Sequence, residues 1–209
     1  WALTASGRFN AARVSIRDQS GIAPQLDGDH RFMRFNPALG LNFNPTAQIT
    51  AYASYNEGMR APTAMELTCA DPAAPCKLPN AFLADPPLRK VVARTLELGG
   101  RGKAGDFTWG AALYRTDLSD DIQFVGSAGA INAGFFQNVG KTRRQGVEIN
   151  GANRWGGFGI VARYSLIDAT YRTGFVENSP SNSTADGNGD ILVSSGKRIP
   201  GVPRQSLHL

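Results

Sequence analysis

Three short stretches contain residue types that perform chemistry in other proteins, but none has the complete spacing. Residues 140–142 (GKT) match the end of a phosphate-binding loop, yet Phe135 stands where that loop needs a glycine. Residues 186–190 (DGNGD) begin like a calcium loop, but Lys197 occupies the position of the bidentate glutamate. Residues 194–197 (SSGK) contain S-x-x-K without its companion motifs. We therefore expect no phosphate site at residues 140–142 and polar loops at the other two stretches, with loose divalent-ion binding at residues 186–190 as a minor alternative.

The remaining candidates for catalysis are equally incomplete. Asp117, Asp120 and Asp121 form an acidic group that we expect to be exposed to solvent near an outer rim. The two histidines, His30 and His208, have no serine, cysteine or aspartate partner at a recognisable triad spacing. The sequence therefore indicates no catalytic residues, no cofactor and no metal site, and it argues against an enzyme.

Two cysteines, Cys69 and Cys76, lie in a loop rich in proline and alanine (CADPAAPC). A metal site would need further ligands, and both histidines are distant in the sequence. The pattern favours a local disulfide and hence an oxidising compartment. Two free thiols are the alternative.

The composition excludes some classes of protein. The 209 residues carry 22 Lys and Arg against 17 Asp and Glu, a net charge of +5. These charges are scattered rather than gathered in a stripe, and the tightest group is Lys141, Arg143 and Arg144, so a solvated rim is favoured over a nucleic-acid interface. No apolar run approaches the roughly 20 residues of a membrane helix. Membrane β-strands need only about 9–11 alternating residues.

A two-residue alternation runs through most of the chain. One face of an expected strand contains Phe107, Trp109, Ala111 and Leu113. The other face contains Thr108, Gly110, Ala112 and Tyr114. No helical stripe competes with this pattern. The eight candidate strands are 1–17, 31–43, 47–57, 90–102, 107–125, 131–154, 158–172 and 197–209.

Aromatic residues are distributed in a way that fits belts at the two edges of a membrane. Packing in an ordinary core is the alternative. The residues concerned are Trp109, Phe135, Phe136, Trp155, Phe158 and Tyr164.

The connections between these strands alternate in length. Short turns are expected at 44–46, 103–106 and 155–157, an intermediate one at 126–130, and long loops at 18–30, 58–89 and 174–196. A soluble sandwich has no reason to sort loop lengths in this way. The pattern predicts an all-β fold: an antiparallel up-and-down transmembrane β-barrel, here a segment of about eight strands with long extracellular loops and short periplasmic turns.

Several motifs resemble one receptor family in their order and spacing. They are 55–67 (YNEGMRAPTAMEL), the cysteine loop and its exit at 66–102, the N-x-G and G-x-E pair at 138–140 and 146–148, and 198–204 (RIPGVPR). Together they resemble the barrel of the TonB-dependent outer-membrane receptors.

This resemblance implies an outer-membrane protein of a Gram-negative bacterium that actively imports a scarce nutrient, such as a ferric siderophore. Its expected partners are TonB, reached through a plug domain, the nutrient ligand and outer-membrane lipid, with no nucleic acid. The sequence contains neither plug nor TonB box. We therefore expect residues 1–209 to be a partial barrel, with the plug and remaining strands outside this chain, and we expect that the segment alone would not form a stable pore.

Candidate substrate contacts are Arg60, Lys77 and Arg89 in the loop 58–89, because a cationic extracellular loop suits an anionic iron chelate. Solvated charge without a ligand is the alternative for each. For the whole protein, a passive porin-like channel and a secreted β-rich adhesin or binding module are the competing hypotheses. A hydrolase built on a barrel is the least supported, since no nucleophile–base pair is present.

Overall fold

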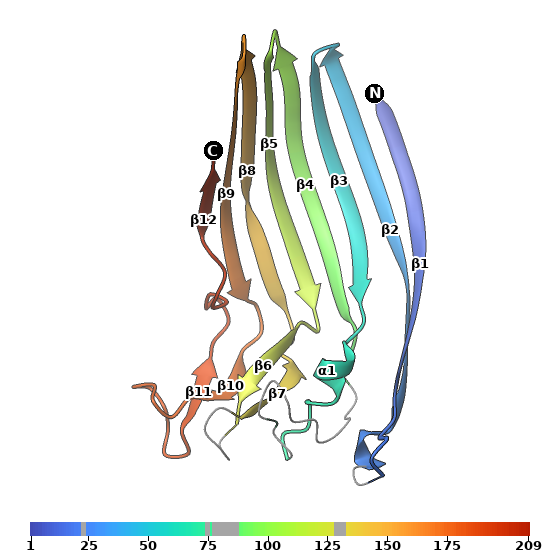
Figure 1. The fold of residues 1–209 in the computed structure, drawn as a ribbon, viewed down its shortest axis with the longest axis vertical. Helices are drawn as coiled ribbons and strands as arrows, with labels where there is room; N and C mark the ends of the chain where they lie inside the picture. The colour runs from blue at the N-terminus through green and yellow to red at the C-terminus, as the bar shows by residue number, and fades with distance from the viewer. Residues whose placement is uncertain (22–23, 74–75, 77–87, 128–132) are drawn as a thin grey trace.

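The computed structural model describes residues 1–21, 24–73, 76, 88–127 and 133–209. Within them, one antiparallel sheet dominates, and each strand pairs with the next main-sheet strand along the chain (Figure 1). This is the predicted up-and-down order. The eight strands of the main sheet are β1 (Ala2–Ile16), β2 (Gly28–Thr46), β3 (Ile49–Arg60), β4 (Val91–Ala104), β5 (Phe107–Ser119), β8 (Thr142–Trp155), β9 (Phe158–Tyr171) and β12 (Gln205–His208).

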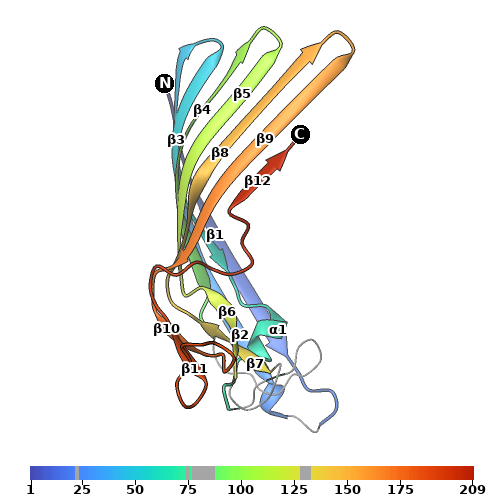
Figure 2. The same cartoon turned by 90° about the vertical axis from the view of Figure 1, so that its left-hand side faces the viewer.

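The predicted alternation of loop lengths is confirmed. Turns of two residues, 47–48, 105–106 and 156–157, join strands at one end of the sheet, drawn at the top in Figure 1. The other connections are long and lie at the opposite end, as Figure 2 also shows. The small elements at that end are η1 (Pro24–Leu26), α1 (Ala64–Leu67), β6 (Ile122–Gly126), β7 (Gly134–Asn138), β10 (Phe175–Asn178) and β11 (Asp190–Val193).

Two predicted strands are each divided in two. The strand expected over 107–125 ends at Ser119, because Asp120 has a φ of 56° and turns the chain into β6. The strand expected over 131–154 is interrupted before β8, where Gly140 has a φ of 85°. Backbone in this left-handed region cannot continue a strand. β6 and β7 therefore form a separate hairpin within a long loop.

Several other boundaries differ from the prediction: β2 runs through the expected turn 44–46 as far as Thr46, and β3 continues to Arg60, past the loop start expected at residue 58. β2 begins at Gly28 rather than at residue 31, because β1 pairs with it as far as Ile16 opposite Gly28. The last strand, expected over 197–209, forms a continuous ladder with β9 over Gln205–His208, while Arg198 makes an isolated bridge to Thr170 of β9. The connection between β1 and β2 is therefore shorter than expected, and the connection between β9 and β12 is longer.

The main sheet has one apolar and one polar face. Leu98, Leu113, Val147 and Leu166 are successive cross-strand partners in a single row, and Leu98 and Leu113 are 59% and 57% exposed. A soluble monomer rarely exposes so continuous an apolar face. On the other face, the rows contain mainly polar side chains, such as Glu97 opposite Tyr114.

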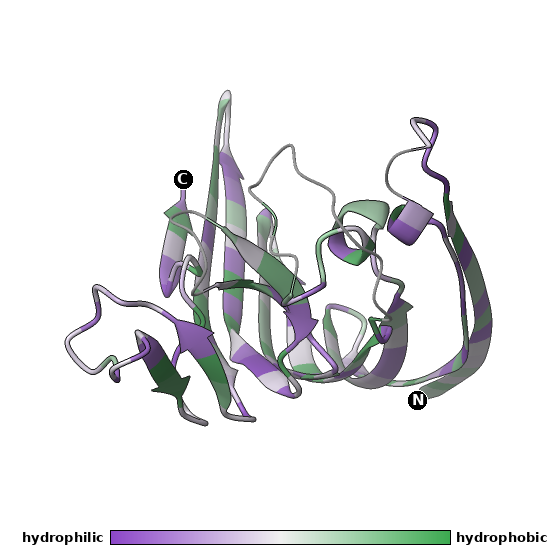
Figure 3. Ribbon diagram, turned by 90° about the horizontal axis from the view of Figure 1, so that it is seen from below, coloured by the Kyte–Doolittle hydropathy of each residue, from purple (hydrophilic) through white to green (hydrophobic). Residues whose placement is uncertain are grey.

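The sheet is bent into an arc, and the polar face lies on its inside. Figure 3 shows the arc end-on, with α1 within the curve. Val14, Ile16 and Leu118, which alternate with the residues of the apolar face, pack against the buried cluster that includes Leu67 of α1. The concave face is therefore the polar one, and the convex face is apolar. This is the arrangement of a barrel wall with lipid outside and a polar lumen inside.

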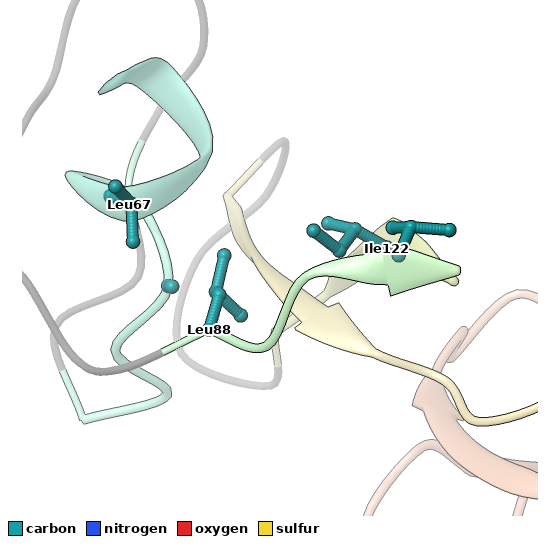
Figure 4. Packing of buried hydrophobic residues seen from close by; sticks show 5 residues of the cluster. Leu67, Leu88 and Ile122 are labelled. Carbon is teal, nitrogen blue, oxygen red and sulfur yellow. The ribbon is translucent and has the colours of Figure 1, made fainter. Parts of the chain in front are cut away.

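The buried core lies under the long connections rather than between two sheets. One cluster joins Leu67, Ala70, Leu88, Val91 and Ile122. Figure 4 shows side chains of this cluster and labels Leu67 of α1, Leu88 at the entry to β4, and Ile122 of β6. A second cluster, nearer β9, contains Val125, Val139, Ala169, Tyr171 and Ile199. The loops are thus held by their own apolar packing.

Four of the aromatic residues predicted for the membrane belts lie in two different settings. Trp155 and Phe158 are cross-strand partners on the apolar face beside the turn 156–157, and they are 61% and 83% exposed. This is where a belt residue is expected. In contrast, Phe135 and Phe136 belong to β7, and Phe136 packs against the first buried cluster. These two are loop-packing residues.

Candidate functional site

Tyrosines lie flat along the polar inner wall instead of projecting into the lumen. The hydroxyl of Tyr52 donates a hydrogen bond to Oε1 of Glu97 at 2.8 Å. Its ring crosses Gly99, its cross-strand partner, where a Cβ atom would overlap it. Tyr114 crosses Gly146 in the same way. Because Gly99 and Gly146 have no side chain, the two tyrosine rings can lie against the strand backbone.

A hollow of about 640 Å³ lies along this inner wall. Glu97, Arg101, Glu148 and Asn150 supply acidic, basic and amide groups to its lining. A second hollow, of about 330 Å³, shares Glu148 and Asn150 and adds Arg163, Ser165, Ser206 and His208. Such a surface can both donate hydrogen bonds to water or a polar partner and accept hydrogen bonds from it. Across the described part of the chain, no cluster of three His, Cys, Asp or Glu side chains could hold a metal ion.

Arg60, one of the predicted substrate contacts, is engaged at the end of β3. Its Nη1 donates to Oε2 of Glu66 at 2.7 Å, and the same oxygen accepts from the Thr63 amide at 2.7 Å. Thr63 in turn caps α1. Burial pushes the pKa of Glu66 up, but the hydrogen bonds and charge of Arg60, with the Thr63 amide, outweigh it and hold that pKa below its ordinary value. Arg60 therefore positions α1.

Arg89 lies at the same end of the sheet and is more open. Its Nη2 lies 2.8 Å from Oδ1 of Asp120, and its side chain is 69% exposed. Its amide donates to Oδ1 of Asn138, whose Nδ2 donates back to the Arg89 carbonyl. These contacts attach the entry of β4 to the β6–β7 loop. The third predicted contact, Lys77, lies outside the described residues.

The predicted disulfide between Cys69 and Cys76 is present, and both residues are buried. Cys76 and Gly134 exchange backbone hydrogen bonds of 2.8 and 3.0 Å, and the amide of Phe136 donates to the Cys69 carbonyl. The disulfide loop thus docks on the edge of β7. The described parts of two long connections are therefore joined through Cys69, Cys76 and β7.

One member of the acidic group is buried, contrary to the prediction of solvent exposure. Asp121 is only 5% exposed and accepts a hydrogen bond from Thr142 Oγ1 at 2.7 Å. Arg144 Nη2 lies 3.6 Å from the same carboxylate. Because β6 leaves the main sheet directly after Asp120, Asp121 turns inward toward the start of β8. Its role is to hold that junction.

Sequence reasoning also missed a charged row on the outward face. Arg94, Asp117 and Arg143 are cross-strand partners on β4, β5 and β8, although more than 20 residues separate each from the next. Position in the chain groups Arg143 with Lys141 and Arg144, which predicts a solvated rim. The alternation signal places Arg143 and Arg144 on opposite faces, and only the register brings the row together.

These features define a class of protein. A curved antiparallel sheet with an apolar convex face, a polar concave face and loop lengths sorted by end is a wall segment of a transmembrane β-barrel. No helix among the described residues has the length and hydropathy needed to cross a membrane.

A family model described as "TonB dependent receptor-like, beta-barrel" matches residues 1–209. The chain therefore belongs to the TonB-dependent receptor family, a family of outer-membrane proteins. This confirms the resemblance found in the sequence motifs.

Solved structures of similar fold are transporters and receptors. The copper transporter OprC has a TM-score of 0.63 and 18% identity, over 80% of this chain and 25% of that one. The ferric yersiniabactin uptake receptor FyuA from Yersinia pestis has a TM-score of 0.56 and 19% identity, over 86% and 23%. The FrpB iron transporter from Neisseria meningitidis (F3-3 variant) has a TM-score of 0.56 and 18% identity, over 80% and 23%. The matched part spans about a quarter of each of these structures.

Proposed function

We propose that this chain forms part of the wall of an outer-membrane active transporter of a Gram-negative bacterium. The transporter imports a scarce nutrient, a ferric siderophore or a similar metal chelate, with energy from the TonB system. The observation that carries this proposal is the family match over residues 1–209 on a wall whose concave face is polar. The similar transporters of iron, copper and a ferric siderophore support it.

The concave wall is suited to a polar domain filling the lumen. Glu97, Arg101, Glu148 and Arg163 give it charges of both signs, and Tyr52 and Tyr114 lie flat against it. We propose that a plug domain and the remaining barrel strands, which this chain does not contain, complete the protein. TonB then acts on the plug. The matched part covers about a quarter of each similar structure, which supports the proposal that further strands and a plug lie outside this chain.

For the substrate contacts, Arg89 and Lys77 are our first candidates on the extracellular loop. The guanidinium of Arg89 supports this choice, since its side chain is 69% exposed even while it pairs with Asp120. Arg60 is the weaker candidate because Glu66 already binds it.

The transport proposal is tested by uptake of radiolabelled ferric chelates into cells that carry only this receptor. We expect saturable uptake that disappears when tonB is deleted or the proton gradient is collapsed. Uptake that continues unchanged in the tonB deletion would instead support the passive, porin-like channel. A matched strain lacking the receptor gives the background.

The substrate contacts are tested with the uptake KM. Arg89→Gln is expected to raise KM by about tenfold for an anionic chelate, the value of a favourable charge interaction of about 1.4 kcal/mol. Arg154→Gln, beside a short turn at the opposite end, serves as the control for lost charge. If Arg89→Gln has the KM of the control, Arg89 does not contact the substrate.

A further inference from the structure

The pairing between β2 and β3 stops partway along both strands. Its last pair toward the long-loop end is Ala38 opposite Asn56. The next residue of β2 is Pro37, which has no N–H to donate to a ladder. Because β1 continues to pair with β2 past this point, it is the β3 side that loses its partner. Within the described residues, 28–37 of β2 pair only with β1, and 57–60 of β3 pair only with β4.

The free part of β2 and the part of β1 that pairs with it form a two-stranded ribbon. It consists of residues 7–16 and 28–37 and is referred to here as the arm. Figure 1 shows it running on beside α1 after β3 has ended. The ladder within the arm is unbroken, and an ion pair between Arg13 and Asp29 also joins its two strands. The arm is therefore a unit of its own, continuous with the wall at its base.

An ion pair between Arg34 and Glu57, referred to here as the latch, connects the arm to β3. The register places Arg34 on the concave face and Glu57 on the convex face, yet the guanidinium donates to the carboxylate. A side chain can cross a sheet in this way only where the ladder is open. The two side chains are 23% and 12% exposed. A second contact spans the same gap in the ladder, because Nζ of Lys90 donates to the Met33 carbonyl at 2.6 Å.

Polar groups beside the latch are buried without hydrogen-bond partners. Among the described residues, neither amide atom of Asn36 has a partner, although this residue is only 5% exposed. Nε of Arg34 and Oδ1 of Asn10 are buried and unpaired in the same way. Such burial costs free energy that water returns when the groups are exposed. This cost offsets part of the stabilisation by the latch and lowers the free energy needed to release the arm.

The far end of the arm rests on the long connections. Val14 and Ile16 are partly buried and pack against the cluster that includes Leu67 and Leu88. Apolar contacts are non-directional, so these side chains can slide over the cluster without breaking a hydrogen bond. A displacement of the arm therefore reaches α1, which contains Leu67.

We propose that the arm is a side gate in the barrel wall. When Arg34 releases Glu57, the arm swings outward about Pro37 and opens the wall between β2 and β3. On β3 and the next two strands, Glu57 shares a row with Arg94 and Asp117, where the apolar convex face ends. The opening therefore begins where released backbone groups of β3 meet water rather than hydrocarbon. This inference concerns the wall itself and does not depend on the proposed transport function.

The test measures distances between spin labels by double electron–electron resonance on the intact protein in bilayers. The arm pair is Met33→Cys/Leu113→Cys, and the base pair is Leu39→Cys/Leu113→Cys. All three side chains are at least 53% exposed on the convex face. The two pairs share one wall position and differ in whether the other label lies beyond Pro37 or before it.

Three substitutions are compared on each labelled pair. Arg34→Gln removes the latch, and Arg34→Lys keeps its charge. Arg13→Gln is the matched control, because it breaks the ion pair with Asp29 inside the arm and leaves the latch in place. Heat-modifiable migration on gels verifies that each variant is folded.

We expect the arm pair of the unmodified protein to show a main short distance and a minor longer one. Arg34→Gln should raise the longer population on the order of fivefold, which corresponds to an ion pair of about 1 kcal/mol. Arg34→Lys and Arg13→Gln should keep the unmodified distribution, and the base pair should not change in any variant.

An arm pair that Arg34→Gln leaves unchanged would overturn the proposal. Equal lengthening in Arg13→Gln, or in the base pair, would do the same, because either would show a general loosening of the wall. If Arg34→Gln does not fold, the unmodified protein decides the question. A single arm-pair distance, no broader in distribution than that of the base pair, would then show that no gate exists.

Discussion

The carboxylate of Glu66 and the guanidinium of Arg60 meet at 2.7 Å, joining the end of membrane strand β3 to the first turn of α1. Since Thr63 is bound by the same carboxylate, one side chain fixes where the loop leaves the wall. From there the chain enters the disulfide loop, which is docked on β7. The placement of the extracellular loops therefore begins at this ion pair.

Acidification is expected to loosen α1. The pKa of Glu66 is lowered in the folded protein, so its ionised form adds stability that is fully present above the ordinary carboxyl pKa and is lost as pH falls through the lowered value. Hydrogen exchange of the amides of 64–68, corrected for intrinsic rates, should show this loss in acid. Glu66→Gln should remove the pH dependence and exchange faster at neutral pH. A variant with the wild-type pH profile would show that another group controls the helix.

Neighbouring residues of β5 should report opposite environments in a membrane. A spin label at Leu113 is expected to meet lipid-soluble oxygen, because this side chain is exposed on the apolar face. A label at Tyr114 should be protected from oxygen on the polar face. Collision rates with oxygen and with a water-soluble quencher, measured on the intact protein in bilayers, check this. Two labels equally open to the aqueous quencher would contradict the assigned faces.

Removing the disulfide should affect the loop and spare the wall. Cys69→Ser/Cys76→Ser releases a short closed loop, for which the chain-entropy model gives about 2 kcal/mol. We expect faster proteolysis within 61–90, with unchanged β-sheet circular dichroism. Reduction of the unmodified protein should reproduce the effect. If cleavage rates stay the same, the backbone hydrogen bonds to β7 are sufficient to hold the loop.

Gly146 is expected to be the least replaceable glycine of β8. A Cβ atom there would overlap the Leu166 carbonyl of the neighbouring strand and the Tyr114 hydroxyl. Gly146→Ala should therefore lower the free energy of unfolding by about 1–3 kcal/mol, the cost of overpacking. Gly159→Ala is the control, because the nearest atom to its Cβ is 4.0 Å away. Chemical denaturation in detergent compares them, and equal midpoints would disprove the steric argument.

The sequence predicted the sheet because the relevant signals are local. Alternation around Leu113 and the difference in length between successive loops were enough to infer a barrel wall with its loops at one end. The disulfide could also be predicted, because Cys69 and Cys76 are close together in the chain. Local signals did not reveal the break at Asp120, beyond which β6 pairs with β7 in a separate sheet.

Long-range features required the register of the strands. The row Arg94, Asp117 and Arg143 brings together residues from three strands, and the alternation alone gives their face but not their partners. The burial of Asp121 likewise depends on Thr142, which lies 21 residues further along. The inner-wall contact between Tyr52 and Glu97 spans 45 residues.

The strict alternation of the wall limits how its gene can change in length. Inserting or deleting one codon early in β5 would exchange the lipid-facing and lumen-facing side chains over the rest of that strand, placing Tyr114 against lipid. Inserting or deleting two codons would keep each side chain on its face and would shift only the register of pairing with the neighbouring strands. In contrast, the connections at the long-loop end can gain residues at little cost. Variation in length between relatives should therefore accumulate in the loops, where it leaves the membrane wall undisturbed.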